Sequence, residues 1–116
     1  IKSTFALALS NRGYAYFKMG EYEKSMRDYK EALKFASDYS ALTHANLAIL
    51  YMYQNRFDDA CREFARAVEI EKTMKKVISL DKSDIIPWLK EHPDKETEVR
   101  ERINRIIAPE KLVECD

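Results

Sequence analysis

The chain has 116 residues, which is enough for one domain with a modest hydrophobic core. Its 46% hydrophobic and 34% charged residues are typical of a helix-rich globular protein, and 2 glycines and 3 prolines leave little material for the turns of an all-β fold. Because 20 basic residues balance 20 acidic residues and no apolar run approaches about 20 residues, the sequence favours neither nucleic acid nor a membrane as a partner.

The first predicted element is a helix hairpin over about residues 5–36. Its second helix carries apolar and small residues at positions i, i+3, i+4, i+7, i+10 and i+11, which lie on one helix face. This stripe consists of Tyr22, Ser25, Met26, Tyr29, Ala32 and Leu33. Gly20 precedes it, at a place where a helix end favours a residue that tolerates the left-handed conformation. We therefore expect the hairpin to turn near Gly20.

A second predicted hairpin, over about residues 39–78, repeats the first. Asn11 aligns with Asn46 at an offset of 35 residues, and Asn55 takes the place of Gly20 at the turn. The aligned residues keep their size class in the pairs Gly13/Ala48, Tyr16/Tyr51, Tyr22/Phe57, Ser25/Ala60, Tyr29/Phe64, Ala32/Ala67 and Leu33/Val68. We expect the small residues, Ala15 among them, to let the two helices of each hairpin approach closely.

The two segments resemble a known family. "NRGYAYFKMGEYEKSMRDYKEAL" (residues 11–33) and "NLAILYMYQNRFDDACREFARAVEI" (residues 46–70) resemble two tetratricopeptide repeats, whose usual period is about 34 residues. The resemblance covers roughly residues 5–72, and one departure is the missing proline between the repeats, in "ASDYSALT". It implies an all-α fold in which residues 1–79 form two antiparallel helix hairpins of a right-handed α-solenoid.

Residues 73–116 do not form a faithful third repeat, because the same offset would place Arg102 where Ala67 packs. We expect the stripe of residues 57–70 to continue through Met74, Val77 and Ile78. Ser83 is expected to cap a short helix, "DIIPWLKEH", before Pro93. A further helix over residues 94–107 places four apolar residues on one face, namely Val99, Ile103, Ile106 and Ile107.

These last helices are predicted to close the solenoid, because a repeat array must cover its final apolar face. Residues 80–108 are therefore expected to be capping helices and residues 109–116 a flexible tail. The alternative is that "IIPWL" exposes Trp88, which would dock another protein or a second copy of the chain. Because the chain opens at Ile1 without an initiator methionine, we expect it to be a fragment of a longer protein.

No pattern in the sequence favours catalysis, a cofactor or a metal site. His44 and His92 have no cysteine, aspartate or second histidine at ligand or triad spacing, and no glycine-rich phosphate loop is present. Cys61 lies on the apolar stripe and is expected to be a small core residue. Cys61 and Cys115 lack the density of a secreted disulfide framework, so we expect a reducing, cytoplasmic location.

A second stripe follows the first helix of each predicted hairpin, at i, i+4, i+7 and i+11. It consists of Leu7, Asn11, Tyr14 and Lys18, followed by Leu42, Asn46, Ile49 and Tyr53. In the resembled family, first helices line a concave groove that binds an extended peptide. The resemblance thus implies a non-enzymatic adaptor that binds a peptide segment or helix through Asn11, Tyr14, Lys18, Asn46, Ile49 and Tyr53. An asparagine amide suits peptide backbone groups, and the alternative is that both asparagines are merely solvated.

A chaperone-tail clamp is a second possible function. Such clamps of the resembled family hold the C-terminal carboxylate of a heat-shock chaperone with asparagine, lysine and arginine side chains, and Asn11 matches the clamp asparagine. The positions that should supply the cations hold Leu42 and Asn46, or Leu7 in the other register. Without cations the carboxylate would lack its charge-assisted hydrogen bonds.

Self-association is a third possibility. The first helix bears Phe5, Leu9 and Tyr16, and no element of the sequence before it is available to cover its outer side. A second copy of the chain could cover this helix, or pack against the C-terminal helices, and form a scaffold.

Overall fold

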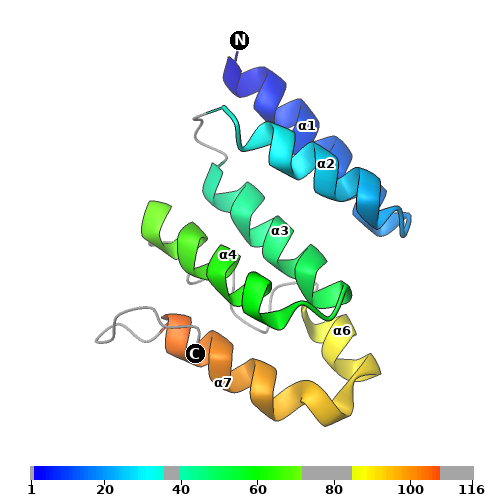
Figure 1. Cartoon of the computed structure of the whole chain (residues 1–116), viewed down its shortest axis with the longest axis vertical. Helices are drawn as coiled ribbons and strands as arrows, with labels where there is room; N and C mark the ends of the chain where they lie inside the picture. The colour runs from blue at the N-terminus through cyan, green and yellow to red at the C-terminus, as the bar shows by residue number, and fades with distance from the viewer. Residues whose placement is uncertain (1, 36–39, 72–84, 108–116) are drawn as a thin grey trace.

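The computed structural model of the chain describes residues 2–35, 40–71 and 85–107. These residues form six α-helices and one 3-10 turn, and no strand occurs among them. The elements are α1 (Lys2–Lys18), α2 (Tyr22–Ala32), α3 (Ser40–Tyr53), α4 (Phe57–Ile70), α6 (Ile85–Glu91), η1 (Pro93–Lys95) and α7 (Glu96–Ile107). In Figure 1 they stack in layers along the long axis, with α1–α2 at one end, α3–α4 in the middle and α6–α7 at the other end. The predicted all-α solenoid of helix hairpins is confirmed.

Both hairpins turn in the same way. Gly20 and Asn55 have backbone φ angles of 80° and 61°, in the left-handed region. In each turn the amide of the third residue after the helix end reaches back five residues, from Glu21 to the Tyr16 carbonyl (2.9 Å) and from Arg56 to the Tyr51 carbonyl (2.8 Å). This hydrogen bond is the mark of a helix end closed by a left-handed residue. The predicted turn positions and their equivalence are therefore confirmed.

Small residues bring α1 and α2 into close contact. Gly13 is buried, and the Ser25 hydroxyl donates a 2.6 Å hydrogen bond to the Gly13 carbonyl across the two helices. Beside this bond the backbone of α1 lies directly against the fully buried Tyr29 ring. The same role predicted for Ala15 is wrong, because Ala15 is exposed. Two residues advance a helix by about 200°, so Gly13 and Ala15 cannot face the same neighbour.

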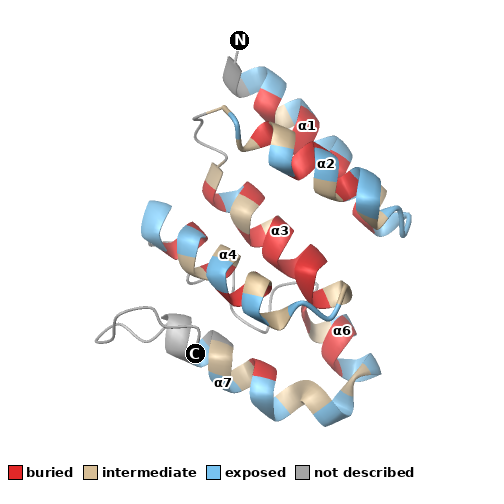
Figure 2. Cartoon of the chain, in the orientation of Figure 1, coloured by how far each residue is buried: buried red, intermediate tan, exposed pale blue. Residues whose placement is uncertain are grey.

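The central helix α3 is the most deeply buried element (Figure 2). Leu47, Leu50 and Met52 are each at most 2% exposed, because α3 packs against α2 on one side and α4 on the other. Between α1 and α3 the Ser10 and Thr43 hydroxyls form a buried 2.9 Å hydrogen bond. The resulting core extends through both hairpins and into α6 and α7.

The predicted end of the second hairpin, near residue 78, lies outside the described residues. Helix α4 ends at Ile70, and Glu71 has an extended backbone (φ −142°, ψ 104°). Met74, Val77 and Ile78, which we expected to prolong the stripe, lie outside the described residues. Ser83, residues 109–116 and the side chains of Ile103, Ile106 and Ile107 also lie outside them.

The short helix α6 buries its tryptophan. Trp88 is 1% exposed, and its ring packs edge-on against Phe57 at the start of α4 (5.4 Å between ring centroids). The His92 ring stacks on the indole, with 4.1 Å between the ring centroids. Ile85 is fully buried one turn before Trp88. Such a tryptophan cannot act as an exposed docking group, which removes the main support for the docking alternative.

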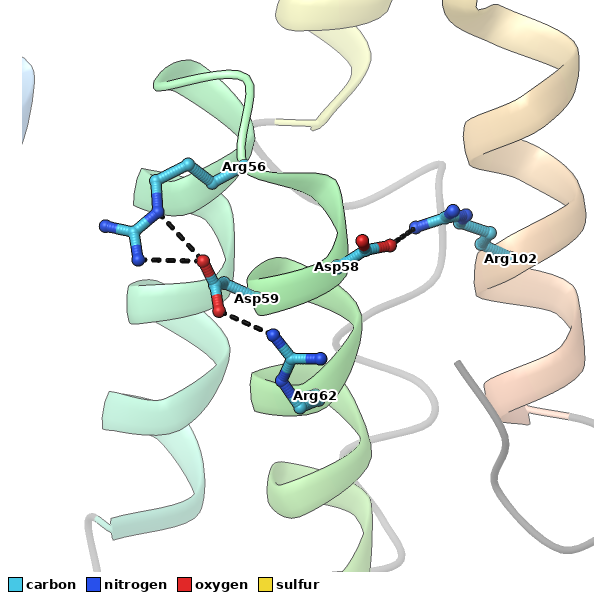
Figure 3. A network of polar contacts seen from close by, with 5 residues as sticks. All are labelled: Arg56, Asp58, Asp59, Arg62 and Arg102. Carbon is cyan, nitrogen blue, oxygen red and sulfur yellow. Dashed lines mark hydrogen bonds and ion pairs between the residues drawn. The ribbon is translucent and has the colours of Figure 1, made fainter. Parts of the chain in front are cut away.

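A polar network at the start of α4 also connects the second hairpin to α7 (Figure 3). Arg102 donates a 2.7 Å hydrogen bond to Asp58, and this ion pair joins residues 44 positions apart in the sequence. On the other side of the same turn, Asp59 accepts hydrogen bonds from Arg56 (2.8 Å) and Arg62 (2.7 Å). Arg102 is charged and so cannot pack as Ala67 does in the second repeat. Its charge instead pairs with Asp58 and connects α7 to the second hairpin.

Acid is expected to weaken this network. The hydrogen bond from Arg62, and then that from Arg56, lowers the pKa of Asp59 below its ordinary value of 3.8. Because the folded pKa lies below the unfolded pKa, this carboxylate stabilises the fold above about pH 4, and the contribution is lost as the pH falls through the folded pKa. The urea midpoint of the wild-type chain should therefore fall more between neutral pH and about pH 3 than that of Asp59→Asn. Equal losses in the two proteins would contradict this role.

Candidate functional site

The predicted partner-binding stripe lies on α1 and α3. Asn11, Tyr14 and Lys18 are exposed on α1, and 37% of Tyr14 is accessible. On α3, Asn46 and Tyr53 are half-buried, whereas Ile49 is only 8% exposed. Five of the six residues therefore offer surface to a partner, while Ile49 contributes mainly to the core beneath them.

Aromatic rings join the two halves of the stripe. Phe17 of α1 contacts Tyr53 of α3 edge-on, with 4.9 Å between ring centroids. Tyr22 lies 5.9 Å from Phe17 and 6.3 Å from Tyr53, and Tyr14 lies 6.1 Å from Phe17. The four rings form a continuous cluster across two hairpins, in which Phe17 is buried and the three tyrosines are at least partly accessible. We call these rings together with Lys18 the aromatic patch.

Lys18 places a positive charge beside this surface. Its Nζ atom lies 5.4 Å from the centroid of Tyr14 and 5.7 Å from that of Phe17, within the range of cation–π attraction. The lysine is therefore held over the rings while its side chain stays exposed. An apolar side chain of a partner could contact the rings while an adjacent carboxylate pairs with the ammonium group.

The two asparagines of the stripe have amide groups that no described residue engages. Neither Asn11 nor Asn46 makes a side-chain hydrogen bond within residues 2–35, 40–71 and 85–107, and Asn11 is exposed. Each amide carries both a donor and an acceptor for peptide backbone groups. The arrangement thus combines aromatic contact area with backbone hydrogen-bonding capacity.

Comparison with known proteins agrees with this architecture. Residues 6–39 and residues 41–74 each match a family model described as tetratricopeptide repeat. The chain belongs to the tetratricopeptide repeat (TPR) family. Proteins with TPR repeats are in general protein–protein interaction modules, and they are generally not enzymes.

One curated relative is the human protein named tetratricopeptide repeat protein 6. It is 32% identical over 69 residues, which are 60% of this chain. The chain spans only 13% of the length of that relative. No solved structure matches the chain.

Two members of the aromatic patch on the first TPR hairpin, Phe17 and Tyr22, were missed by the sequence reasoning. The stripe at i, i+4, i+7 and i+11 skips Phe17, and Tyr22 is assigned to the packing face of α2. The repeat alignment pairs Tyr22 with Phe57, but the two residues have different neighbours, because Phe57 packs against Trp88. The alignment therefore does not indicate that Tyr22 belongs to the patch. The contact with Tyr53 depends on how two hairpins stack, which a helical period does not specify.

The places that a chaperone-tail clamp requires hold no cation in this TPR pair. Leu42 is 39% exposed and Asn46 is half-buried, at the two positions where a lysine and an arginine would be needed. Leu7, the corresponding residue in the other register, is half-buried. Lys18 is part of the aromatic patch and lies at neither of these positions.

Both histidines of the TPR chain have structural partners. His44 Nδ1 lies 2.6 Å from the Glu63 carboxylate, between α3 and α4, and His92 Nδ1 lies 2.9 Å from the Trp88 carbonyl oxygen. Among the described residues, no group of three or more histidine, cysteine, aspartate or glutamate side chains is placed to hold a metal ion. In the same residues, no helix has the length and apolar character needed to cross a bilayer. Cys61 is buried and forms no disulfide within the described part of the chain, as expected for a small core residue.

Proposed function

We propose that the chain is a non-enzymatic adaptor that binds a peptide segment or a helix of a partner protein. The binding surface is the stripe of α1 and α3, with Asn11, Tyr14, Lys18, Asn46 and Tyr53 in contact with the partner and Ile49 supporting it from the core. A buried Cys61 that forms no disulfide with a described residue fits a reducing compartment, and we propose the cytoplasm.

The contact between Phe17 and Tyr53 carries this proposal. It brings Tyr14 and Lys18 of the first hairpin into one surface with Tyr53 of the second. Tyrosine supplies large contact area at a low cost in side-chain entropy, and aromatic residues dominate the energetics of many interfaces. A partner segment that crosses both hairpins would therefore meet rings and a lysine at the patch, and asparagine amides beside it.

The aromatic patch suggests the chemistry of the segment. Rings of Tyr14, Tyr22 and Tyr53 suit an apolar or aromatic anchor side chain. Lys18 suits an acidic residue next to that anchor, because a carboxylate near a lysine over aromatic faces forms a charge-assisted hydrogen bond. We therefore propose a segment that carries an apolar anchor beside a carboxylate.

Truncation of the patch should remove most partner binding. In affinity capture with the full chain, Tyr14→Ala/Lys18→Ala should lower the affinity for captured partners at least about tenfold, the scale of an interface hot spot. Asn11→Ala/Asn46→Ala should cause a smaller loss. Ile70→Ala/Lys90→Ala is a matched control, because it removes one exposed apolar residue and one exposed lysine from α4 and α6. If both stripe variants bind the captured partners with wild-type affinity, the stripe is not the binding surface.

Binding of a peptide with the acidic tail of a heat-shock chaperone distinguishes a chaperone-tail clamp from the proposed adaptor. The proposed surface predicts weak binding of such a peptide, because Leu42 and Asn46 replace the clamp cations. Micromolar binding that is lost in Asn11→Ala would instead establish a clamp function for this chain.

Self-association through α1 is the other alternative, and one observation favours it. Phe5 is 50% exposed and contacts Phe35 edge-on at 5.4 Å between ring centroids, which leaves an apolar corner of the first hairpin accessible. Sedimentation of the full chain tests this alternative. A dimer that Phe5→Ser dissociates would support a scaffold function, and a monomer at high concentration would exclude it.

A further inference from the structure

A groove distinct from the stripe follows α2 to the turn between α3 and α4. It encloses about 550 Å³, and four cationic side chains line it, namely Arg27, Lys30, Lys34 and Arg56. None of the stripe residues and no member of the aromatic patch borders this groove. A ligand in this groove would therefore use side chains that the proposed function leaves unused.

The groove has an excess of positive charge. Two acidic side chains, Glu23 and Glu31, stand against the four cations. Lys34 pairs with Glu31 at 2.9 Å, and Arg56 pairs with Asp59. Arg27 and Lys30 are exposed and form no ion pair with any described residue. Carboxylates of a ligand would therefore meet two cations that are not neutralised within the described part of the chain.

The wall of the groove also contains a buried hydrogen-bond acceptor. The Oε1 atom of Gln54 is buried and has no hydrogen-bond partner among the described residues, and Gln54 borders the groove beside Arg56. A buried acceptor without a donor is unfavourable, and a backbone N–H of a bound peptide could satisfy it. Met26 adds a half-buried apolar contact. A phosphodiester backbone carries negative charge but has no N–H donor for the glutamine.

We propose that this groove binds an acidic peptide segment of a partner protein. Carboxylates of the segment pair with Arg27 and Lys30, its backbone N–H approaches Gln54, and an apolar side chain contacts Met26. The chain would then have two separate peptide-binding surfaces, one on the first helices of the hairpins and one along α2.

Fluorescence anisotropy with the full chain tests this proposal. The probe is a labelled peptide of repeated Glu-Glu-Leu units, and the matched peptide has Gln-Gln-Leu units. Arg27→Glu/Lys30→Glu should weaken binding of the acidic peptide about tenfold at low salt, because exposed ion pairs each contribute up to about 1 kcal/mol and reversal adds repulsion. Added salt should weaken the complex of the wild-type chain with the acidic peptide. The affinity of the wild-type chain for the glutamine peptide should be no higher than the affinity of the charge-reversed variant for the acidic peptide.

Arg66→Glu/Lys90→Glu is the matched control, because it makes the same change in net charge on exposed cations of α4 and α6. It should change affinity less than about twofold, since these two residues lie outside the groove. Equal losses in the two charge-reversed proteins would overturn the proposal. Tighter binding of a single-stranded oligonucleotide than of the acidic peptide, or loss of peptide binding only in Tyr14→Ala/Lys18→Ala, would overturn it as well.

Discussion

Removal of residues 80–116 is expected to unfold the two hairpins or to drive them to aggregate. Ile85, Trp88 and Val99 are each at most 5% exposed, and together they cover α4 and the end of α3. At roughly 25 cal/mol per Å² of apolar area, an uncovered helix face loses several kcal/mol, which is comparable with the whole stability of a small domain. Repeat arrays need about three units for stability, and the two matched repeats supply two of them.

Thermal melting and sedimentation of the truncated chain check this expectation. A milder variant, Trp88→Ala in the full chain, should lose about 3–5 kcal/mol, the usual cost of emptying a buried aromatic site. Lys90→Ala on the exposed side of α6 is its control and should melt like the wild type. If the truncated chain stays monomeric and melts cooperatively at an unchanged temperature, the capping role of residues 80–108 is wrong.

Replacement of Gly13 by alanine should destabilise the chain by about 1–3 kcal/mol, the range of overpacked cores. A Cβ atom at this position would lie 2.9 Å from two ring atoms of Tyr29 and 3.3 Å from the Asp28 Cβ. The Tyr29 ring is fully buried, so moving it away from the added methyl group would disturb the packed core. The expected sign is opposite to helix propensity, which favours alanine over glycine by about 1 kcal/mol.

Urea denaturation of Gly13→Ala measures this effect, and a double-mutant cycle with Tyr29→Ala isolates it. Without the ring, the added methyl group should cost little or should stabilise the helix. Ala48 occupies the equivalent place in the second hairpin, so Ala48→Gly should destabilise by about 1 kcal/mol and show that the two hairpins differ at this contact. A neutral or stabilising Gly13→Ala in the wild-type background would contradict the close approach.

The repeat could be predicted from the sequence because its determinants are local. Gly20 and Asn55 indicate the turns, because these residue types tolerate the left-handed backbone conformation that a turn needs. Cys61 and Phe64 recur at helical spacing and so indicate the packing face of α4. Such signals need only a few neighbouring residues. The family resemblance adds the pairing of the two hairpins, which the period alone does not give.

The parts that could not be predicted depend on what lies next to each helix. Ile49 and Tyr14 occupy equivalent positions, yet Ile49 is 8% and Tyr14 37% exposed, because α3 packs between α2 and α4 whereas α1 packs mainly against α2. The ion pair between Asp58 and Arg102 joins distant parts of the chain. Likewise, Phe17 enters the aromatic patch only because Tyr53 of the next hairpin packs against it.

Site-specific photo-crosslinking tests the central claim, that a partner segment binds the stripe of α1 and α3. A photoreactive benzoyl-phenylalanine in place of Tyr14 keeps an aromatic ring in the patch, and the same group in place of Glu69 on the exposed side of α4 is the control. The account predicts that captured partners crosslink at position 14 and not at position 69. Crosslinks of equal yield at both positions, or at position 69 alone, would contradict it.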